Sequence, residues 1–110
     1  MADDRLIAAL DVSTRAAAEQ LVTRLGDSVS FYKVGMELFY ALGGDIVTWL
    51  KEQEKKVFLD LKLHDIPNTV GNGLCSLLRL RPDILNVHTA GGLRMMKAAH
   101  DALHAAAEEA

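Results

Sequence analysis

The sequence is short of the features that mark secreted and membrane proteins. It contains a single cysteine, Cys75, so no internal disulfide can form, and one thiol is typical of a reducing compartment. No apolar run approaches the ~18 residues that a membrane-spanning helix requires. The first residues are acidic, and the apolar run over residues 6–10 is too short for the core of a signal peptide. We therefore expect a soluble protein of the cytoplasm with no membrane partner.

Positive charge is also scarce. The chain has 12 Lys and Arg residues against 15 Asp and Glu residues, a formal net charge of −3, and no basic run or stripe stands out. This distribution argues against a nucleic-acid partner, whose phosphates require a clustered positive surface. An anionic small molecule stays compatible with the sequence, because its site needs only a few local cations.

Aromatic residues make up 5% of the chain and prolines number two, so the sequence offers neither an aromatic core nor a proline-rich linker. Hydrophobic residues make up 50% and charged residues 25%, the balance of an ordinary globular domain. A length of 110 residues suits one compact domain with an aliphatic core.

What the sequence does contain is an alternation of short apolar runs with longer segments of helical periodicity. The runs predict buried strands over Leu6–Leu10, Val29–Val34, Val57–Leu61 and Ile84–Val87. The periodic segments predict helices over about 14–25, 36–42, 45–54, 68–80 and 93–107. Ser13 or Thr14 is expected to cap the first helix, and Asp45 the third. Pro67 fits the first turn of the fourth helix.

Four βα units predict parallel strands covered by helices, and two architectures fit them. One is a small open, doubly wound sheet, and the other is half of a TIM (β/α)8 barrel. Titratable side chains stand at the C-terminal ends of successive strands, which a barrel would gather into one site and a flat sheet would spread along a line. These residues are Asp11, Lys33, Asp60 with Lys62, and His88. We therefore predict half of a TIM barrel with parallel strands in the order 1-2-3-4.

The third strand carries the densest chemical signal. Asp60 and Lys62 are two positions apart, so in a regular strand their side chains share a face. An ion pair that closes the top of the barrel would explain them without any activity. A network that also includes Asp11 and Lys33 would instead keep Lys62 protonated. Such a network suits a reaction in which negative charge appears at carbon and a proton follows.

The segment Asp60–Thr69, Asp-Leu-Lys-Leu-His-Asp-Ile-Pro-Asn-Thr, resembles the signature of the orotidine 5′-monophosphate decarboxylase family. Three further segments resemble the family's other N-terminal segments in the same order: Ala9-Leu10-Asp11, Lys33-Val34-Gly35 and Asn86-Val87-His88-x-x-Gly91-Gly92. The resemblance implies a lyase of pyrimidine biosynthesis that converts orotidine 5′-monophosphate to uridine 5′-monophosphate. It also implies that residues 1–110 form the N-terminal half of the barrel, and that the C-terminal half with its phosphate-binding loops is absent.

By the same resemblance, Asp60 would destabilise the substrate carboxylate and Lys62 would donate a proton to the ring carbon. Asp11 and Lys33 would hydrogen-bond the ribose hydroxyls and complete the charge network. The family uses neither a metal nor an organic cofactor, so we expect none here. The expected partner is therefore a nucleotide-monophosphate substrate.

The resemblance further implies a homodimer with shared active sites. Asp65, as a catalytic residue, would reach into the site of the partner subunit. Ile66 and Thr69 would accompany it as substrate-binding residues.

Three other interpretations stay open. A sugar-phosphate decarboxylase of the same superfamily would share Asp-x-Lys-x-x-Asp, but those relatives place an acid where Lys33 stands, usually with a metal. A Schiff-base aldolase could use Lys62, but such a lysine must lose its proton readily, and the nearby Asp60 and Asp65 act against that. The third is a non-catalytic half barrel that associates through the open edges of its first and fourth strands.

A few residues near strand and helix ends are secondary candidates. His88 would face the mouth of the barrel, either as a neutral, hydrogen-bonded rim residue or with a direct catalytic role. His100 and His104 have the spacing of metal ligands on one helix, but no third ligand is evident and a solvated face is favoured. The pair Gly91-Gly92 fits either a phosphate cradle or a tight βα turn.

Overall fold

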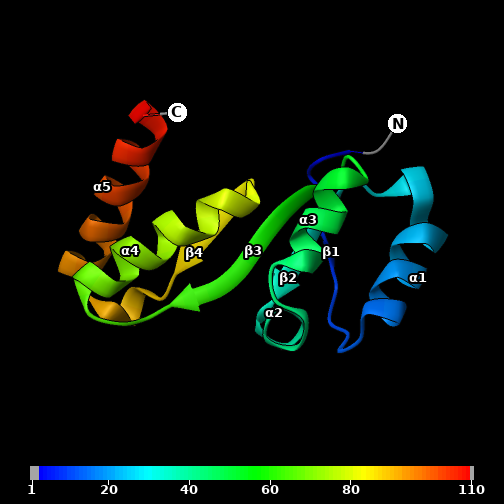
Figure 1. The fold of residues 1–110 in the computed structure, drawn as a ribbon, viewed down its shortest axis with the longest axis horizontal. Coiled ribbons are helices and arrows are strands. Elements are labelled where there is room, and N and C mark those ends of the chain that lie inside the picture. The colour runs from blue at the N-terminus through cyan, green and yellow to red at the C-terminus, as the bar shows by residue number, and fades with distance from the viewer. Residues whose placement is uncertain (1–2, 110) are drawn as a thin grey trace. The chain divides into compact units, whose positions relative to one another are not determined.

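The structure, a computed structural model, describes residues 3–109. Its strands form one four-stranded sheet in the order β1-β2-β3-β4 (Figure 1). The strands are β1 (Ala8–Ala9), β2 (Phe31–Gly35), β3 (Lys56–Leu63) and β4 (Ile84–Val87). β1 pairs with β2, and β2 with β3, in parallel. The predicted parallel (βα)4 order is therefore confirmed, and the order 2-1-3-4 of a doubly wound sheet is excluded.

Helices follow the strands as the periodicity predicts. They are α1 (Arg15–Leu25), α2 (Met36–Leu42), α3 (Asp45–Glu52), α4 (Pro67–Leu77) and α5 (Leu93–Glu109). Three-residue 3₁₀ helices over Gly26–Ser28, Leu78–Leu80 and Thr89–Gly91 continue or precede them. No helix in the described part of the chain is long and apolar enough to cross a membrane.

The first strand departs most from its prediction. The strand is present but limited to Ala8 and Ala9; Leu10 is buried, whereas Leu6 is 57% exposed and Ile7 36% exposed, so the predicted start at Leu6 and its burial there were wrong. The physical reason is its position at the edge of the sheet, where β2 is its one neighbour. Apolar runs identify a strand but do not reveal how much of it finds a partner.

Helix starts follow local capping chemistry. Thr14 is the N-cap of α1, and its Oγ1 accepts a hydrogen bond from the Ala17 N–H at 3.1 Å. Asp45 is not a cap, contrary to the prediction, because Gly44 takes the N-cap position and Asp45 begins α3. An acidic side chain in the first turn still interacts favourably with the helix dipole. Pro67 occupies the first turn of α4, as predicted.

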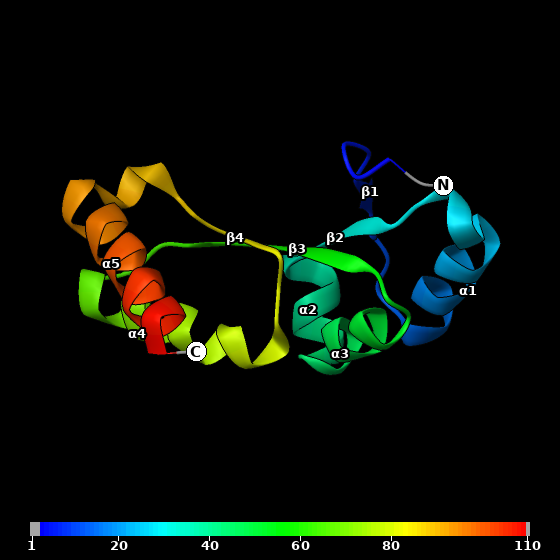
Figure 2. The ribbon, with the colours of Figure 1, turned by 90° about the horizontal axis from the view of Figure 1, so that it is seen from above.

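The chain divides into two compact units, Met1–Asp60 with Pro82–Ile84, and Leu61–Arg81 with Leu85–Ala110. The first unit buries side chains of β2 and α3 completely; among them are Tyr32, Val34, Ile46, Val47 and Leu50. In the second unit α4 and α5 lie side by side in both views (Figure 2). Between them lies a small apolar core of Val70, Leu74, Met95 and Ala99.

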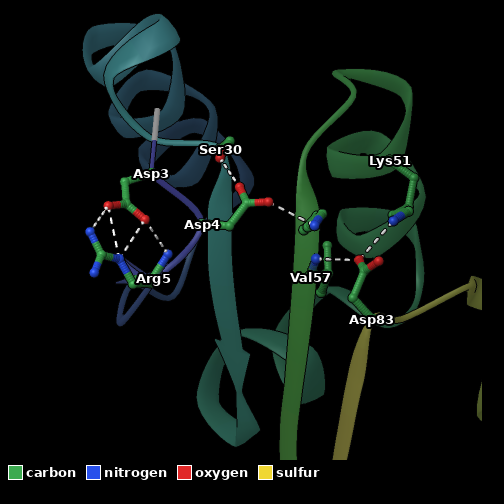
Figure 3. A network of polar contacts seen from close by, with 8 residues as sticks. Asp3, Asp4, Arg5, Ser30, Lys51, Val57 and Asp83 are labelled. Atoms are coloured by element: carbon green, nitrogen blue, oxygen red, sulfur yellow. Dashed lines mark hydrogen bonds and ion pairs between the residues drawn. The ribbon is translucent and has the colours of Figure 1, made fainter. Parts of the chain in front are cut away.

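Two aspartates tie together the N-terminal ends of the strands in the first unit (Figure 3). The carboxylate of Asp4 accepts hydrogen bonds from the Lys56 ammonium at 2.7 Å and from the Ser30 hydroxyl at 2.6 Å. The bond from Lys56, followed by that from Ser30, lowers the pKa of Asp4. Because Asp4 is exposed, water screens this contact.

Asp83, the residue just before β4, also forms hydrogen bonds with β3. Its Oδ2 accepts from the Val57 N–H at 2.8 Å, and its own N–H donates to the Val57 carbonyl at 2.8 Å. The ammonium of Lys51 lies 2.8 Å from the same oxygen. One carboxylate therefore satisfies a strand N–H and anchors α3 to the end of the sheet (Figure 3).

The Asp83 contacts predict a stability difference between two substitutions. Asp83→Ala removes the acceptor of both donors and should lower the free energy of unfolding by about 1–3 kcal/mol. Asp83→Asn keeps an oxygen for Val57 and should lose less. Urea unfolding measures both. Equal losses would show that the bond to Val57 contributes nothing, and no loss in either variant would contradict the anchoring role altogether.

Candidate active site

The ends of β2 and β3 bring a lysine and an aspartate together, as predicted. Lys33 Nζ lies 3.4 Å from Asp60 Oδ2, while in the strand register Asp60 stands opposite Gly35. The Lys33 side chain therefore reaches forward along the sheet to the carboxylate. The Asp60 side chain is 8% exposed and that of Lys33 31%. A buried carboxylate is costly without a nearby positive charge, and Lys33 supplies one.

Asp11 reaches the same end of the first unit but not the charge pair. The N–H of Leu10 donates to the Lys33 carbonyl at 2.9 Å, so the chain after β1 continues beside β2. Asp11 itself is exposed, and within residues 3–109 its side chain makes no hydrogen bond or ion pair. Its predicted contact with a ribose therefore stays a prediction.

The backbone of Lys62 adopts an unexpected conformation. Its φ is 51°, in the left-handed region, which costs an L-residue other than glycine roughly 1–2 kcal/mol. Its N–H donates to Asn86 Oδ1 at 2.9 Å, and the residue is exposed. The alternation argument assumed an extended backbone, so it does not fix the direction of this side chain. Asp60 belongs to the first unit and Lys62 to the second, and their proximity stays a prediction.

The loop after β3 is held by local contacts. Asp65 Oδ1 accepts a hydrogen bond from the N–H of Ile66 at 2.7 Å, and the Ile66 side chain is 65% exposed. Thr69 is exposed in the first turn of α4. The predicted role of these three residues at a subunit interface is not tested by the single chain. A shallow hollow in the second unit is lined by His64, Asp65, Ile66, Pro67, Ala90 and Gly91.

His88 is a hydrogen-bonded residue at the end of β4. Its Nδ1 accepts from the Ala90 N–H at 3.1 Å, so a neutral ring in this arrangement carries its proton on Nε2. The ring stacks on that of His64, with 5.1 Å between centroids and 18° between planes. These contacts fit the predicted rim histidine, while a direct catalytic role stays a prediction.

The side chains of Met95 and His64 pack closely against Gly91. A Cβ at this position would overlap the Met95 thioether and press on the His64 ring. Met95 is fully buried, so a side chain at position 91 would require the end of the Met95 side chain to shift. This close approach of the Met95 side chain gives a packing reason for the glycine, while the phosphate-cradle and tight-turn interpretations of Gly91-Gly92 both stay predictions.

The helical histidines form no evident metal site. His100 and His104 lie with ring centroids 4.3 Å apart, and His100 Nδ1 is 3.2 Å from Asp101 Oδ1. In the described part of the chain, no group of three or more His, Cys, Asp or Glu side chains is placed to hold a metal ion.

Sequence reasoning missed Asn86 and Asp83. It placed Asn86 in the fourth strand and in a family-like segment but gave it no role, yet this residue is the acceptor for the Lys62 N–H. The signal was available, because Asn86 is the single polar residue in Ile84–Val87. Asp83 was given no role, although its carboxylate accepts from two donors.

Parallel strands in sequential order, ending in a buried charge pair, define the chain as four consecutive βα units of the TIM-barrel type. The chain belongs to the orotidine 5′-phosphate decarboxylase / HUMPS family, whose family model matches residues 4–109.

Individual relatives agree with this assignment. A protein named orotidine 5′-phosphate decarboxylase from Carboxydothermus hydrogenoformans is 54% identical over 97 residues, 88% of this chain and 40% of its own length. One of the same name from Bacillus cytotoxicus is 51% identical over 104 residues, 94% of this chain and 44% of its own. The crystal structure of orotidine 5′-phosphate decarboxylase from Lactobacillus acidophilus superimposes with a TM-score of 0.84 at 47% identity. The superposition covers 94% of this chain and 46% of the chain in that crystal structure. The chain therefore spans less than half the length of these relatives.

A double-mutant cycle tests the charge pair. Lys33→Met keeps the length of the side chain but removes the charge, and Asp60→Asn keeps the shape of the carboxylate. Each should lower the free energy of unfolding, and the double variant should lose about 1–3 kcal/mol less than the sum of the two. The change from wild type is measured by chemical denaturation. Strictly additive losses would mean that the 3.4 Å contact carries no coupling.

Proposed function

We propose that the protein containing this chain decarboxylates orotidine 5′-monophosphate to uridine 5′-monophosphate in pyrimidine biosynthesis. The observation that carries the proposal is the pair formed at the strand ends by Lys33 of β2 and the buried Asp60, the first residue of the Asp-x-Lys-x-x-Asp motif. The names of the relatives support the same reaction.

The proposed chemistry uses charges that are already fixed in the folded protein. Asp60 stands against the substrate carboxylate and disfavours it in the bound state. The bond between the ring carbon and the carboxylate breaks, CO₂ leaves, and the electron pair stays on carbon. The ammonium of Lys62 stabilises this carbanion and then transfers a proton to it. No electron acceptor and no metal is needed for the balance of the reaction.

Substrate binding is proposed to involve residues on both sides of this centre. Lys33 and Asp11 would hydrogen-bond the ribose hydroxyls, with Lys33 already held by Asp60. Asp65, Ile66 and Thr69 would act across the interface of a homodimer, which fits the exposure of Ile66. We place the protein in the cytoplasm, where a single free thiol is stable.

Lys33 favours this reaction over a metal-dependent decarboxylation of a sugar phosphate. The family name covers HUMPS proteins as well, so membership alone leaves the substrate open. A metal-dependent relative would have an acid at position 33. Here an ammonium lies 3.4 Å from Asp60 and would repel a divalent cation at that carboxylate.

Lys62→Ala in the full-length protein should abolish most of the decarboxylase activity. Loss of one preorganised electrostatic group costs ~10²–10³ in rate, and the additional loss of the proton donor should increase that figure. Conversion of orotidine monophosphate is followed by ultraviolet absorbance. Lys97→Ala, which removes an exposed lysine of α5, is the matched control and should leave the rate unchanged. An active Lys62→Ala variant would remove this residue from the mechanism.

The 110-residue chain alone should show no measurable turnover. Binding energy from a remote phosphate helps to position and strain the reacting group, and no residue described above is placed as a phosphate grip. The assay is the same, on purified chain at high concentration, with the Lys62→Ala chain as a control for contaminating enzyme. Activity that disappears with this substitution would overturn the expectation and place a phosphate site within these residues.

A further inference from the structure

Lys62 holds a conformation that its residue type disfavours. With φ at 51° it lies in the left-handed region, although it stands within β3 rather than in a turn. Side chains other than glycine, asparagine and aspartate rarely adopt this conformation. Strain of this kind persists only where the surrounding structure imposes it, and it is concentrated at functional sites.

β4 and the residue that follows it bind the backbone at the strained residue and at the next one. The N–H of Lys62 donates to the Asn86 side-chain oxygen at 2.9 Å. One residue further on, the carbonyl of Leu63 accepts from the His88 N–H at 2.9 Å. The second bond is an ordinary contact between backbones. The first depends on the side chain at position 86 and so on the sequence.

From this geometry we infer that Asn86 is a positioning residue: its amide oxygen holds the backbone of Lys62 in the left-handed conformation and so sets the direction of the ammonium. This inference rests on the proposed function, in which that ammonium protonates the substrate. Without the acceptor, the Lys62 backbone would relax to a negative φ and its side chain would leave the strand in another direction.

Two substitutions of similar size separate positioning from bulk. In the full-length protein, Asn86→Leu keeps the branching and number of side-chain heavy atoms but offers no acceptor. It should lower kcat by ~10–100-fold, as expected for a misplaced reacting group, and leave KM within about threefold. Asn86→Asp restores an acceptor oxygen and should recover most of the lost kcat. Ser76→Ala is the matched control, because it removes a side-chain bond to the Asn72 carbonyl within the same unit and should keep the wild-type rate.

A crystal structure of the Asn86→Leu protein provides a readout that does not depend on activity. The φ of Lys62 should become negative, while the bond from His88 to Leu63 persists. If this variant does not fold, Asn86→Ala takes its place in both measurements.

The outcomes distinguish this inference from the function on which it rests. A wild-type protein without decarboxylase activity would refute the proposed function, and the φ of Lys62 in the variant would still test the positioning. Asn86→Leu with a wild-type kcat, Asn86→Asp as impaired as Asn86→Leu, or an unchanged φ at Lys62 would each overturn the role of Asn86.

Discussion

The candidate site depends on a carboxylate that is kept charged inside the protein. Asp60 is buried at the end of the β2–β3 ladder, where an isolated negative charge would be strongly disfavoured. Lys33, on the neighbouring strand, lies 3.4 Å away and is itself only partly exposed. Each charge lowers the free-energy cost of removing the other from water. The register of the two strands fixes this arrangement, because a slip by one residue would turn the side chain of Asp60 to the other face of the sheet.

Side-chain oxygens accept hydrogen bonds from backbone N–H groups near both ends of β3. At the start of β3, Asp83 accepts the Val57 N–H, and near its end, Asn86 accepts the Lys62 N–H. Asn86 lies within β4, and Asp83 is the residue just before β4. The acceptor at the start of β3 is therefore acidic, and the one near its end is neutral. The acidic one, Asp83, also binds Lys51.

Much of the fold could be predicted from the sequence because apolar periodicity reports burial directly. The bounds of β4 were predicted as the structure has them, and Thr14 and Pro67 mark helix starts through chemistry that is local to a few residues. The length of β1 could not be predicted, because it depends on which neighbours an edge strand finds. The pairing of Lys33 with Asp60 followed from their places at strand ends. The conformation of Lys62 did not, since it depends on an acceptor 24 residues further along the chain.

Gly91 limits how sequences of this fold can diverge. Because a Cβ at this position would overlap the end of the Met95 side chain, a relative with alanine at position 91 would need either another conformation of Met95 or a smaller residue at position 95. Met95 in turn fills the core between α4 and α5 with Val70 and Leu74, so the volume it gives up must be regained by a neighbour. A substitution at Gly91 would therefore also affect the packing between α4 and α5. We expect positions 91 and 95 to co-vary among homologues as a coupled pair.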